Sequence, residues 1–179
     1  QQVGAVLAMF TALTLGNLGR LAEAYRWWRT ARQIADQCGD RDTQLTIRGR
    51  ESVRALHEGR SPQRILRLIS EAEPLEPVSP SAGWPELLCG KAQALAVLGR
   101  GPEALTALRE LSASFSDLPA AVAEDRQSFL GWPENRLRFT ESFVYAHLGR
   151  LAEAQVAQDR AITLYPAGYP QGPAQIELQ

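Results

Sequence analysis

The chain has 179 residues, of which 45% are hydrophobic and 22% charged, a balance that is ordinary for a folded protein and argues against wholesale disorder. Its formal net charge is −1, from 19 basic and 20 acidic residues, so it has no long-range attraction to a phosphate backbone and we expect no direct contact with nucleic acid. The two cysteines form no C-x-x-C pair. The apolar stretch at residues 3–15 is shorter than a membrane-spanning helix and lacks the basic region of a signal peptide. We therefore expect a segment of a longer cytoplasmic protein with no membrane contact.

A seven-residue motif divides the chain into repeats. LGRLAEA at Leu18–Ala24 returns unchanged at Leu148–Ala154, and weaker copies stand at Glu58–Arg64 and Leu98–Ala104. The glycines of these copies fall at 19, 59, 99 and 149, so they are about 40 to 50 residues apart. Self-similarity at such a period is typical of a helical repeat array.

The first repeat, about residues 3–40, is predicted to form two helices, over 3–17 and 21–38, that meet at Gly19. The second of these helices carries apolar residues at i, i+3, i+4 and i+7 spacing, which indicates one buried face. That stripe consists of Leu21, Ala24, Tyr25, Trp28, Ala31, Ile34 and Ala35. The adjacent Trp27 points about 100° away from Trp28, so we expect it to cover a neighbouring repeat or to mark a partner surface.

The second repeat, about residues 42–75, is the most polar. Ser61 and Pro62 have the residue types of an N-cap and a first helical residue. Arg64 and Glu71 stand where the other repeats have alanine at helix contacts, so this repeat is expected to pack loosely or to turn those side chains outward. The prolines at 74, 77 and 80 predict an extended linker over residues 76–82.

The third repeat, about residues 84–116, and the fourth, about residues 133–166, both open at the tetrapeptide GWPE, which places proline and glutamate at a helix start. Trp84 and Trp132 in these tetrapeptides are expected to anchor the helix starts by packing. An insert over residues 117–131 is expected to add a short helix. Residues 173–179 have the pattern of the first turn of a further repeat.

The pattern resembles the tetratricopeptide family, in which two antiparallel helices meet at a glycine and touch through small residues. The fourth copy is the most faithful, with Tyr145, Gly149, Ala154, Ala161 and Pro166 in the family positions. The resemblance implies an all-α superhelical array of antiparallel helix pairs that occupies the whole chain and needs no cofactor. HEAT-like helix pairs are the alternative at this period.

A closer resemblance is to the repeat regions that follow an Xre-type helix-turn-helix in transcriptional regulators of high-GC actinobacteria. The runs that carry it are AYRWWRTARQIAD, RGRESVRALHEGR and RLRFTESFVYAHLGR, the last preceded by GWPEN. This resemblance implies a DNA-binding domain upstream of Gln1 and a sensor or interaction role for this segment. No DNA-contacting residue carries over, because the sequence does not contain the matching domain.

In tetratricopeptide arrays the first helices line the concave face, and positions about 13, 10, 6 and 2 residues before each turn glycine point inward. Here these positions combine an apolar and aromatic floor with polar side chains, which suits a peptide, an amphipathic small molecule or a protein partner. They also include Glu86 and Cys89. With arginines one position later, the candidate groove residues are Met9, Leu13, Asn17, Arg50, Arg54, His57, Gln93, Arg136, Phe139, Phe143 and His147. The alternative is that the two phenylalanines pack against a further repeat and the arginines are solvated.

Catalytic and metal-binding patterns are missing from the sequence. There is no G-x-S-x-G, H-E-x-x-H, G-x-G-x-x-G or Walker loop, and Glu51, Glu58 and Glu141 are expected on polar helix faces. The only two histidines share one repeat position, with no third ligand at zinc-like spacing. We expect neither an enzyme nor a metal site.

The predicted function is the sensor or interaction region of a transcriptional regulator, which binds a peptide, small ligand or protein in its groove and forms a homodimer. The alternative is a constitutive interaction or dimerisation scaffold that senses nothing.

Overall fold

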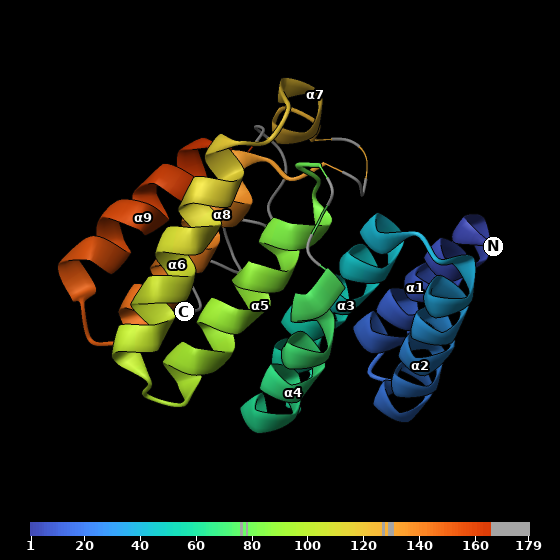
Figure 1. Cartoon of the computed structure of the whole chain (residues 1–179). Helices are drawn as coiled ribbons and strands as arrows, with labels where there is room; N and C mark the ends of the chain where they lie inside the picture. The colour runs from blue at the N-terminus through green and yellow to red at the C-terminus, as the bar shows by residue number, and fades with distance from the viewer. Residues whose placement is uncertain (76, 78, 127, 129–130, 166–179) are drawn as a thin grey trace.

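The computed structural model describes residues 1–75, 77, 79–126, 128 and 131–165. Over these residues the chain is helical and has no strand, and Figure 1 shows antiparallel helix pairs stacked side by side from the blue N-terminal end to the red C-terminal end. This arrangement confirms the predicted all-α, tetratricopeptide-like array of helix pairs. The turn predicted at 173–179 lies outside the described residues, as do Pro166 and parts of the expected linker and insert.

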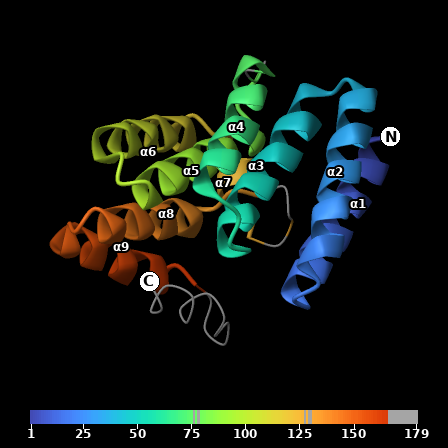
Figure 2. The ribbon, with the colours of Figure 1, turned by 90° about the horizontal axis from the view of Figure 1, so that it is seen from below.

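Each repeat contributes one pair of helices. The pairs are α1 (Gln2–Asn17) with α2 (Leu21–Cys38), α3 (Arg41–His57) with α4 (Pro62–Ala72), α5 (Gly83–Val97) with α6 (Gly101–Ser116), and α8 (Glu134–His147) with α9 (Leu151–Thr163). A single turn of 3-10 helix, η1 (Glu73–Leu75), follows α4, and the short α7 (Ala120–Ala123) lies in the expected insert. In both Figure 1 and Figure 2 the pairs follow one another in chain order, so α3 lies between the first pair and α5.

The repeated LGR motif forms the turn inside each pair. Gly19 and Gly149 have φ of 73° and 71°, a left-handed conformation that only glycine adopts without strain. The arginine that follows each of these glycines bonds the glutamate three residues later, as in Arg20–Glu23 and Arg150–Glu153, and both pairs lie in solvent. The motif therefore stabilises the turn and the start of the next helix, and in the fourth repeat its Leu148 also packs against the core.

Small residues let the helices approach each other closely. Trp28 is fully buried between α1 and α2, where Ala31 and Ala35 leave room for it. Ile47 of α3 joins the same cluster, so the core continues from one repeat into the next. The prediction that Trp28 belongs to the core is confirmed.

The apolar stripe of α2 is shorter than the sequence predicts. Leu21 and Tyr25 are both exposed, so they lie outside the core, and Leu151 at the repeat position of Leu21 is exposed as well. The guanidinium of Arg60 lies 5.3 Å from the centre of the Tyr25 ring and covers it in place of core side chains. Periodicity identified the correct face of the helix, but Leu21 and Tyr25 at its start remain in solvent.

The charged residues of the second repeat divide into two groups. Arg64 and Glu71 point to solvent, one of the two outcomes expected for them. Glu51, in contrast, is fully buried, where it is ion-paired with Arg32 and accepts a hydrogen bond of 2.8 Å from Arg60 Nη1. The prediction of a polar, solvated face is therefore wrong for Glu51, because Arg32 of α2 and Arg60 of the turn between α3 and α4 neutralise it inside the array.

Two helix starts differ from the expected ones. Helix α5 begins at Gly83, two residues before the proline that was expected to open it. Ser61 is the N-cap residue of α4, but its hydroxyl bonds the side chain of Gln63 at 2.5 Å and caps no backbone N–H. At α3 the N-cap bond does form, since the Asp40 carboxylate accepts from the backbone N–H of Thr43 at 2.9 Å.

Candidate binding groove

A cavity of about 680 Å³ lies among the first helices of repeats two, three and four, and we call it the central groove. Its size is in the range of ordinary ligand sites. The residues that line it are Arg50, Val53, Arg54, His57, Glu86, Cys89, Gln93, Trp132, Arg136, Phe139, Thr140, Phe143, His147 and Tyr165. Three helices that are far apart in the sequence thus present their inward faces to one space.

Most of the groove residues expected from the sequence meet in this cavity. Those that line it are Arg50, Arg54, His57, Gln93, Arg136, Phe139, Phe143 and His147. Counting back from each turn glycine was sufficient to bring them together. Trp132, Thr140 and Tyr165 line the cavity too, but they lie outside the inward register and the counting missed them.

The candidates from the first repeat lie elsewhere, which corrects the expectation that they form the groove floor. Met9 is fully buried and Leu13 packs against the same cluster, because α3 covers this side of α1 through Ile47. Asn17 is exposed at the end of α1, where its Oδ1 accepts a hydrogen bond of 2.8 Å from Arg54 Nη2. Asn17 therefore contributes indirectly, by holding an arginine that does line the groove.

A buried carboxylate forms the charged centre of the groove. Glu86 Oε2 accepts hydrogen bonds from the Trp132 indole at 2.8 Å and from Arg136 Nη1 at 2.9 Å, and Oε1 lies 3.4 Å from Arg50 Nη1. Burial opposes ionisation of this carboxyl, but the two guanidiniums and the two hydrogen bonds outweigh it and lower the pKa of Glu86. The sequence placed Glu86 on the inner face, yet nothing in it pairs this residue with an arginine 50 positions later.

Positive charge exceeds negative charge around the cavity. Its described lining contains three arginines and one glutamate, so the groove favours an anionic group in its occupant. Burial lowers the pKa of Arg50, and the neighbouring Glu86 carboxylate opposes that shift. A second anion entering the groove would meet desolvated cations, where charge-assisted hydrogen bonds are stronger than in water.

The floor of the groove is polar, and its cysteine is not reactive. Cys89 Sγ lies 2.9 Å from Thr140 Oγ1, and burial raises the pKa of the thiol to about 12, so it stays protonated near neutral pH and is no nucleophile. Gln93 is fully buried, and its Nε2 donates to Cys89 Sγ at 3.5 Å. Its Oε1 accepts no hydrogen bond from any residue that the structure describes. A buried carbonyl in that state costs about 1–3 kcal/mol, which a donor group on a ligand would recover.

Aromatic rings form one wall. Phe143 stacks on His147 with ring centres 4.1 Å apart, and His57 faces Phe139 and Phe143 from α3 at 6.3 Å and 6.4 Å. Burial lowers the pKa of His57, and the charge of Arg54 lowers it further. The shared repeat position of the histidines thus places both of them beside one phenylalanine, Phe143. Within the described part of the chain, no three His, Cys, Asp or Glu side chains cluster as a metal site requires.

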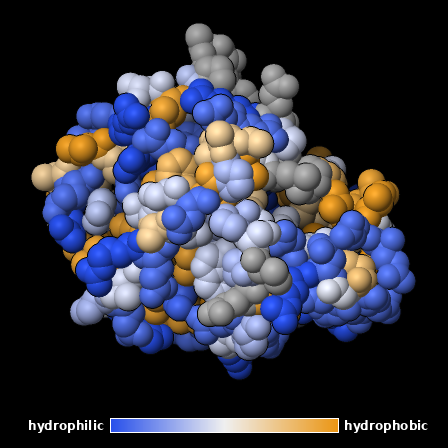
Figure 3. All heavy atoms as spheres, turned by 45° about the horizontal axis from the view of Figure 1, so that its top comes forward, coloured by the Kyte–Doolittle hydropathy of each residue, from blue (hydrophilic) through white to orange (hydrophobic). Residues whose placement is uncertain are grey.

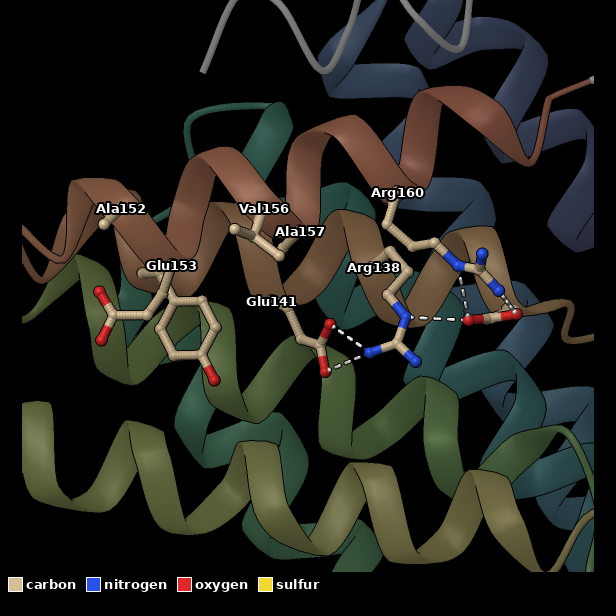
Figure 4. A pocket seen from close by; sticks show the side chains of 9 residues that line it. Arg138, Glu141, Ala152, Glu153, Val156, Ala157 and Arg160 are labelled. Atoms are coloured by element: carbon tan, nitrogen blue, oxygen red, sulfur yellow. Dashed lines mark hydrogen bonds and ion pairs between the residues drawn. The ribbon is translucent and has the colours of Figure 1, made fainter.

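A second cavity, also of about 680 Å³, lies between α8 and α9 (Figure 4). Four of its charged side chains pair with one another: Arg138 bonds Glu141 at 2.8 Å and Glu134 at 3.0 Å, and Arg160 approaches Glu134 at 3.4 Å. The fifth, Glu153, pairs with Arg150 outside the cavity lining. Glu141 is thus half-buried in an ion pair rather than free on a polar face. Because the side chains of this network neutralise one another, the second cavity leaves fewer charged groups for a ligand to bind than the central groove does.

Comparison with known proteins agrees with the repeat pattern. The tetratricopeptide repeat family matches residues 5–30 and 85–110, which lie in the first and third helix pairs. No curated protein and no solved structure matches the chain. The similarity supports a tetratricopeptide protein, and such repeats generally serve as interaction scaffolds without catalytic activity. No helix in the described part of the chain is long and apolar enough to cross a bilayer.

Proposed function

We propose that this chain is a protein-interaction module whose central groove binds an extended, acidic peptide segment of a partner protein. The observation that carries the proposal is the convergence, from three helices, of a cationic centre, an aromatic wall and the buried Gln93 carbonyl in one cavity. The similarity to tetratricopeptide repeats supports a protein partner over a small metabolite.

Each part of the groove corresponds to a different part of a peptide. An acidic side chain of the peptide reaches the guanidiniums of Arg50 and Arg136, beside the Glu86 carboxylate that they already share. A peptide N–H donates to Gln93 Oε1 on the floor after this side chain, which is buried in the unliganded chain, turns toward the peptide. An apolar or aromatic side chain packs against Phe139, with His57 opposite. An extended peptide satisfies all of these contacts, since its backbone donors and side chains alternate along its length.

We further propose that the module is the sensor region of a transcriptional regulator, in which the bound peptide changes the stacking of the repeats and so the attached DNA-binding domain. This role is supported by the likeness of three sequence runs to Xre-type regulators. Repeat arrays flex readily because each interface between repeats is small. A helix-turn-helix upstream of residue 1 is required by this role, and its absence from the full-length gene would exclude it.

The binding proposal is tested by selecting peptides from a random displayed library on the purified chain and measuring their affinity by calorimetry. Gln93→Leu removes the floor acceptor while preserving volume, so we expect peptide affinity to fall about tenfold with no loss of stability. Gln155→Leu makes the same change on the exposed face of α9 and serves as the control. Selected peptides that bind both variants as tightly as the unchanged protein would exclude the groove as their site.

A further inference from the structure

A network of charged side chains leads from the first helix pair into the central groove. Arg32 of α2 pairs with Glu51, and Glu51 Oε1 accepts a hydrogen bond of 2.8 Å from Arg60 Nη1. Arg60 Nη2 in turn lies 3.0 Å from Glu58 Oε2, and Glu58 Oε1 lies 3.9 Å from Arg54 Nε. The last member, Arg54, lines the groove. We call these five residues the ion-pair network.

Burial distinguishes this network from the ion pairs in solvent. Hydrophilic side chains cover much of the face of the molecule shown in Figure 3, and pairs such as Arg20–Glu23 lie in solvent. In the ion-pair network, by contrast, the side chains of Glu51 and Glu58 are only 1% and 5% exposed. Three guanidiniums share these two carboxylates, so the network carries one positive charge in excess. Because burial limits screening by water, this excess charge attracts an anion more strongly than a surface arginine does.

The excess charge of the network falls on Arg54. Its contact with Glu58 is the longest in the network, and neither Arg54 Nε nor Glu58 Oε1 makes a hydrogen bond with any residue that the structure describes. The other two arginines, Arg32 and Arg60, each bond a carboxylate oxygen directly. Burial lowers the pKa of His57 and the charge of Arg54 lowers it further, so this charge acts within the groove that both residues line.

The end of α1 fixes the position of Arg54. Asn17 Oδ1 accepts a hydrogen bond of 2.8 Å from Arg54 Nη2. A Cβ atom at Gly16 would lie 2.5 Å from Glu58 Oε1 and 3.3 Å from Arg54 Nη2, so glycine leaves the room that both side chains need. The guanidinium is therefore held by the first repeat, although the residue itself belongs to the second.

The spacing of arginines along α3 determines the spacing of the acidic groups that they can bind. The α3 residues that line the groove are Arg50, Val53, Arg54 and His57, so the groove follows this helix. Arg50 and Arg54 are four residues apart, which corresponds to about 6 Å along a helix. In an extended peptide, alternate side chains point the same way and are about 6.6 Å apart. Acidic side chains at positions i and i+2 of such a peptide match the two arginines.

We propose that the first repeat selects the bound peptide, because it holds Arg54 where this residue binds a second acidic side chain, two residues away from the one at Arg50 and Arg136. This inference rests on the proposed function, in which an extended acidic peptide occupies the central groove. The class of peptide is then acidic-x-acidic, where x is any residue. Arg54 contacts the peptide, whereas Asn17 and Glu58 are positioning residues that act through Arg54.

Calorimetry with peptides selected from the random displayed library tests the inference, and these peptides should carry acidic residues at i and i+2. The tightest one is compared with two versions in which one or the other acidic residue is replaced by its amide. We expect Arg54→Gln to weaken the parent peptide by about tenfold, but to change the affinity of one amide version by less than about twofold. Asn17→Ala should weaken the parent peptide by about threefold and spare the same amide version. Asn135→Ala makes the same change on α8, outside the groove lining, and should alter no affinity.

Comparing the three peptides separates positioning from damage to the fold. A variant that only loosened the array would weaken all three alike, whereas loss of one contact is not additive with loss of the acidic group that it binds. Asn17 is exposed at the end of α1, so Asn17→Ala is expected to keep the thermal midpoint of the unchanged chain.

Two results would overturn the inference and leave the proposed function standing. The selected peptides would bind in the groove without an acidic pair at i and i+2, or Arg54→Gln would affect all three peptides equally. If no library peptide binds the unchanged chain, the inference and the proposed function both fail.

Discussion

Replacing Glu86 by glutamine should destabilise the array strongly. In the folded chain this carboxylate is buried against Arg50 and Arg136 and accepts the Trp132 indole hydrogen bond. Glutamine keeps the size of the side chain and one acceptor oxygen, but it removes the negative charge and turns an amide donor toward the guanidiniums. Arg50 and Arg136 both lose the buried carboxylate that they share, a loss that is costly in a desolvated site.

The magnitude follows from this burial. Removing one partner of a buried ion pair costs about 3–5 kcal/mol. For a chain of this length each kcal/mol shifts the thermal midpoint by about 2–4 °C, so a fall of about 6–20 °C is expected. Folding holds the pKa of Glu86 below its ordinary value of 4.5, so this stabilisation is complete above that value and is lost as the pH falls through the folded pKa. The difference between the two proteins should therefore shrink on acidification below about pH 4.5.

Urea unfolding followed by far-ultraviolet circular dichroism measures the effect at pH 7 and at several acidic values. Glu103→Gln is the control, since Glu103 also pairs with an arginine but does so in solvent. We expect no measurable change in its unfolding midpoint. If Glu86→Gln behaved like this control, or if its deficit did not shrink in acid, the buried carboxylate would not hold the groove together as described.

Two further predictions concern helix packing and the aromatic wall. Gly4→Ala should stabilise the chain by up to about 1 kcal/mol, because the new methyl meets only Ile34 at an ordinary 3.6 Å and alanine favours a helix. Gly49→Ala should destabilise the chain by about 1–3 kcal/mol, since its methyl would lie 2.9 Å from the backbone nitrogen of Leu87. Urea titrations of both variants compare the two effects. Equal unfolding midpoints would contradict the close approach of α3 and α5. His57 should titrate below its ordinary pKa of 6.5 in an NMR pH series, because folding removes part of its ring from water and places it beside the Arg54 cation. Its contribution to stability should fade as the pH falls from 6.5 through the folded value, and an unshifted titration would contradict both causes.

The helix pairs and the groove residues differ in how far the sequence determines them. Turn glycines such as Gly19 and the 3.6-residue periodicity are local signals, so the pairs and the core position of Trp28 followed from the sequence. The inward register predicted Gln93 and Phe143 in the groove for the same reason. Counting from a glycine assumes that every repeat packs alike, and it failed for Met9, which lies under the next repeat.

The ion pairs within the array could not be predicted from the sequence. Glu51 looks like a residue of a polar face, because the arginines that neutralise it come from α2 and from the turn after α3. The same holds for Glu86, whose partners lie on α3 and α8. The exposed Leu151 shows the opposite case, since an apolar residue at a core spacing stays in solvent. Such contacts depend on where helices end and meet in space, which periodicity does not encode.

The central claim, that a partner peptide occupies the central groove, is tested most directly by NMR of the isotope-labelled chain with a selected acidic peptide. We predict that the largest shift changes appear at the Gln93 side-chain amide and at the rings of His57 and His147, while residues of the second cavity such as Val156 stay unchanged. Shift changes confined to α9, or spread along the outward face of α1, would contradict the assignment of the groove as the binding site.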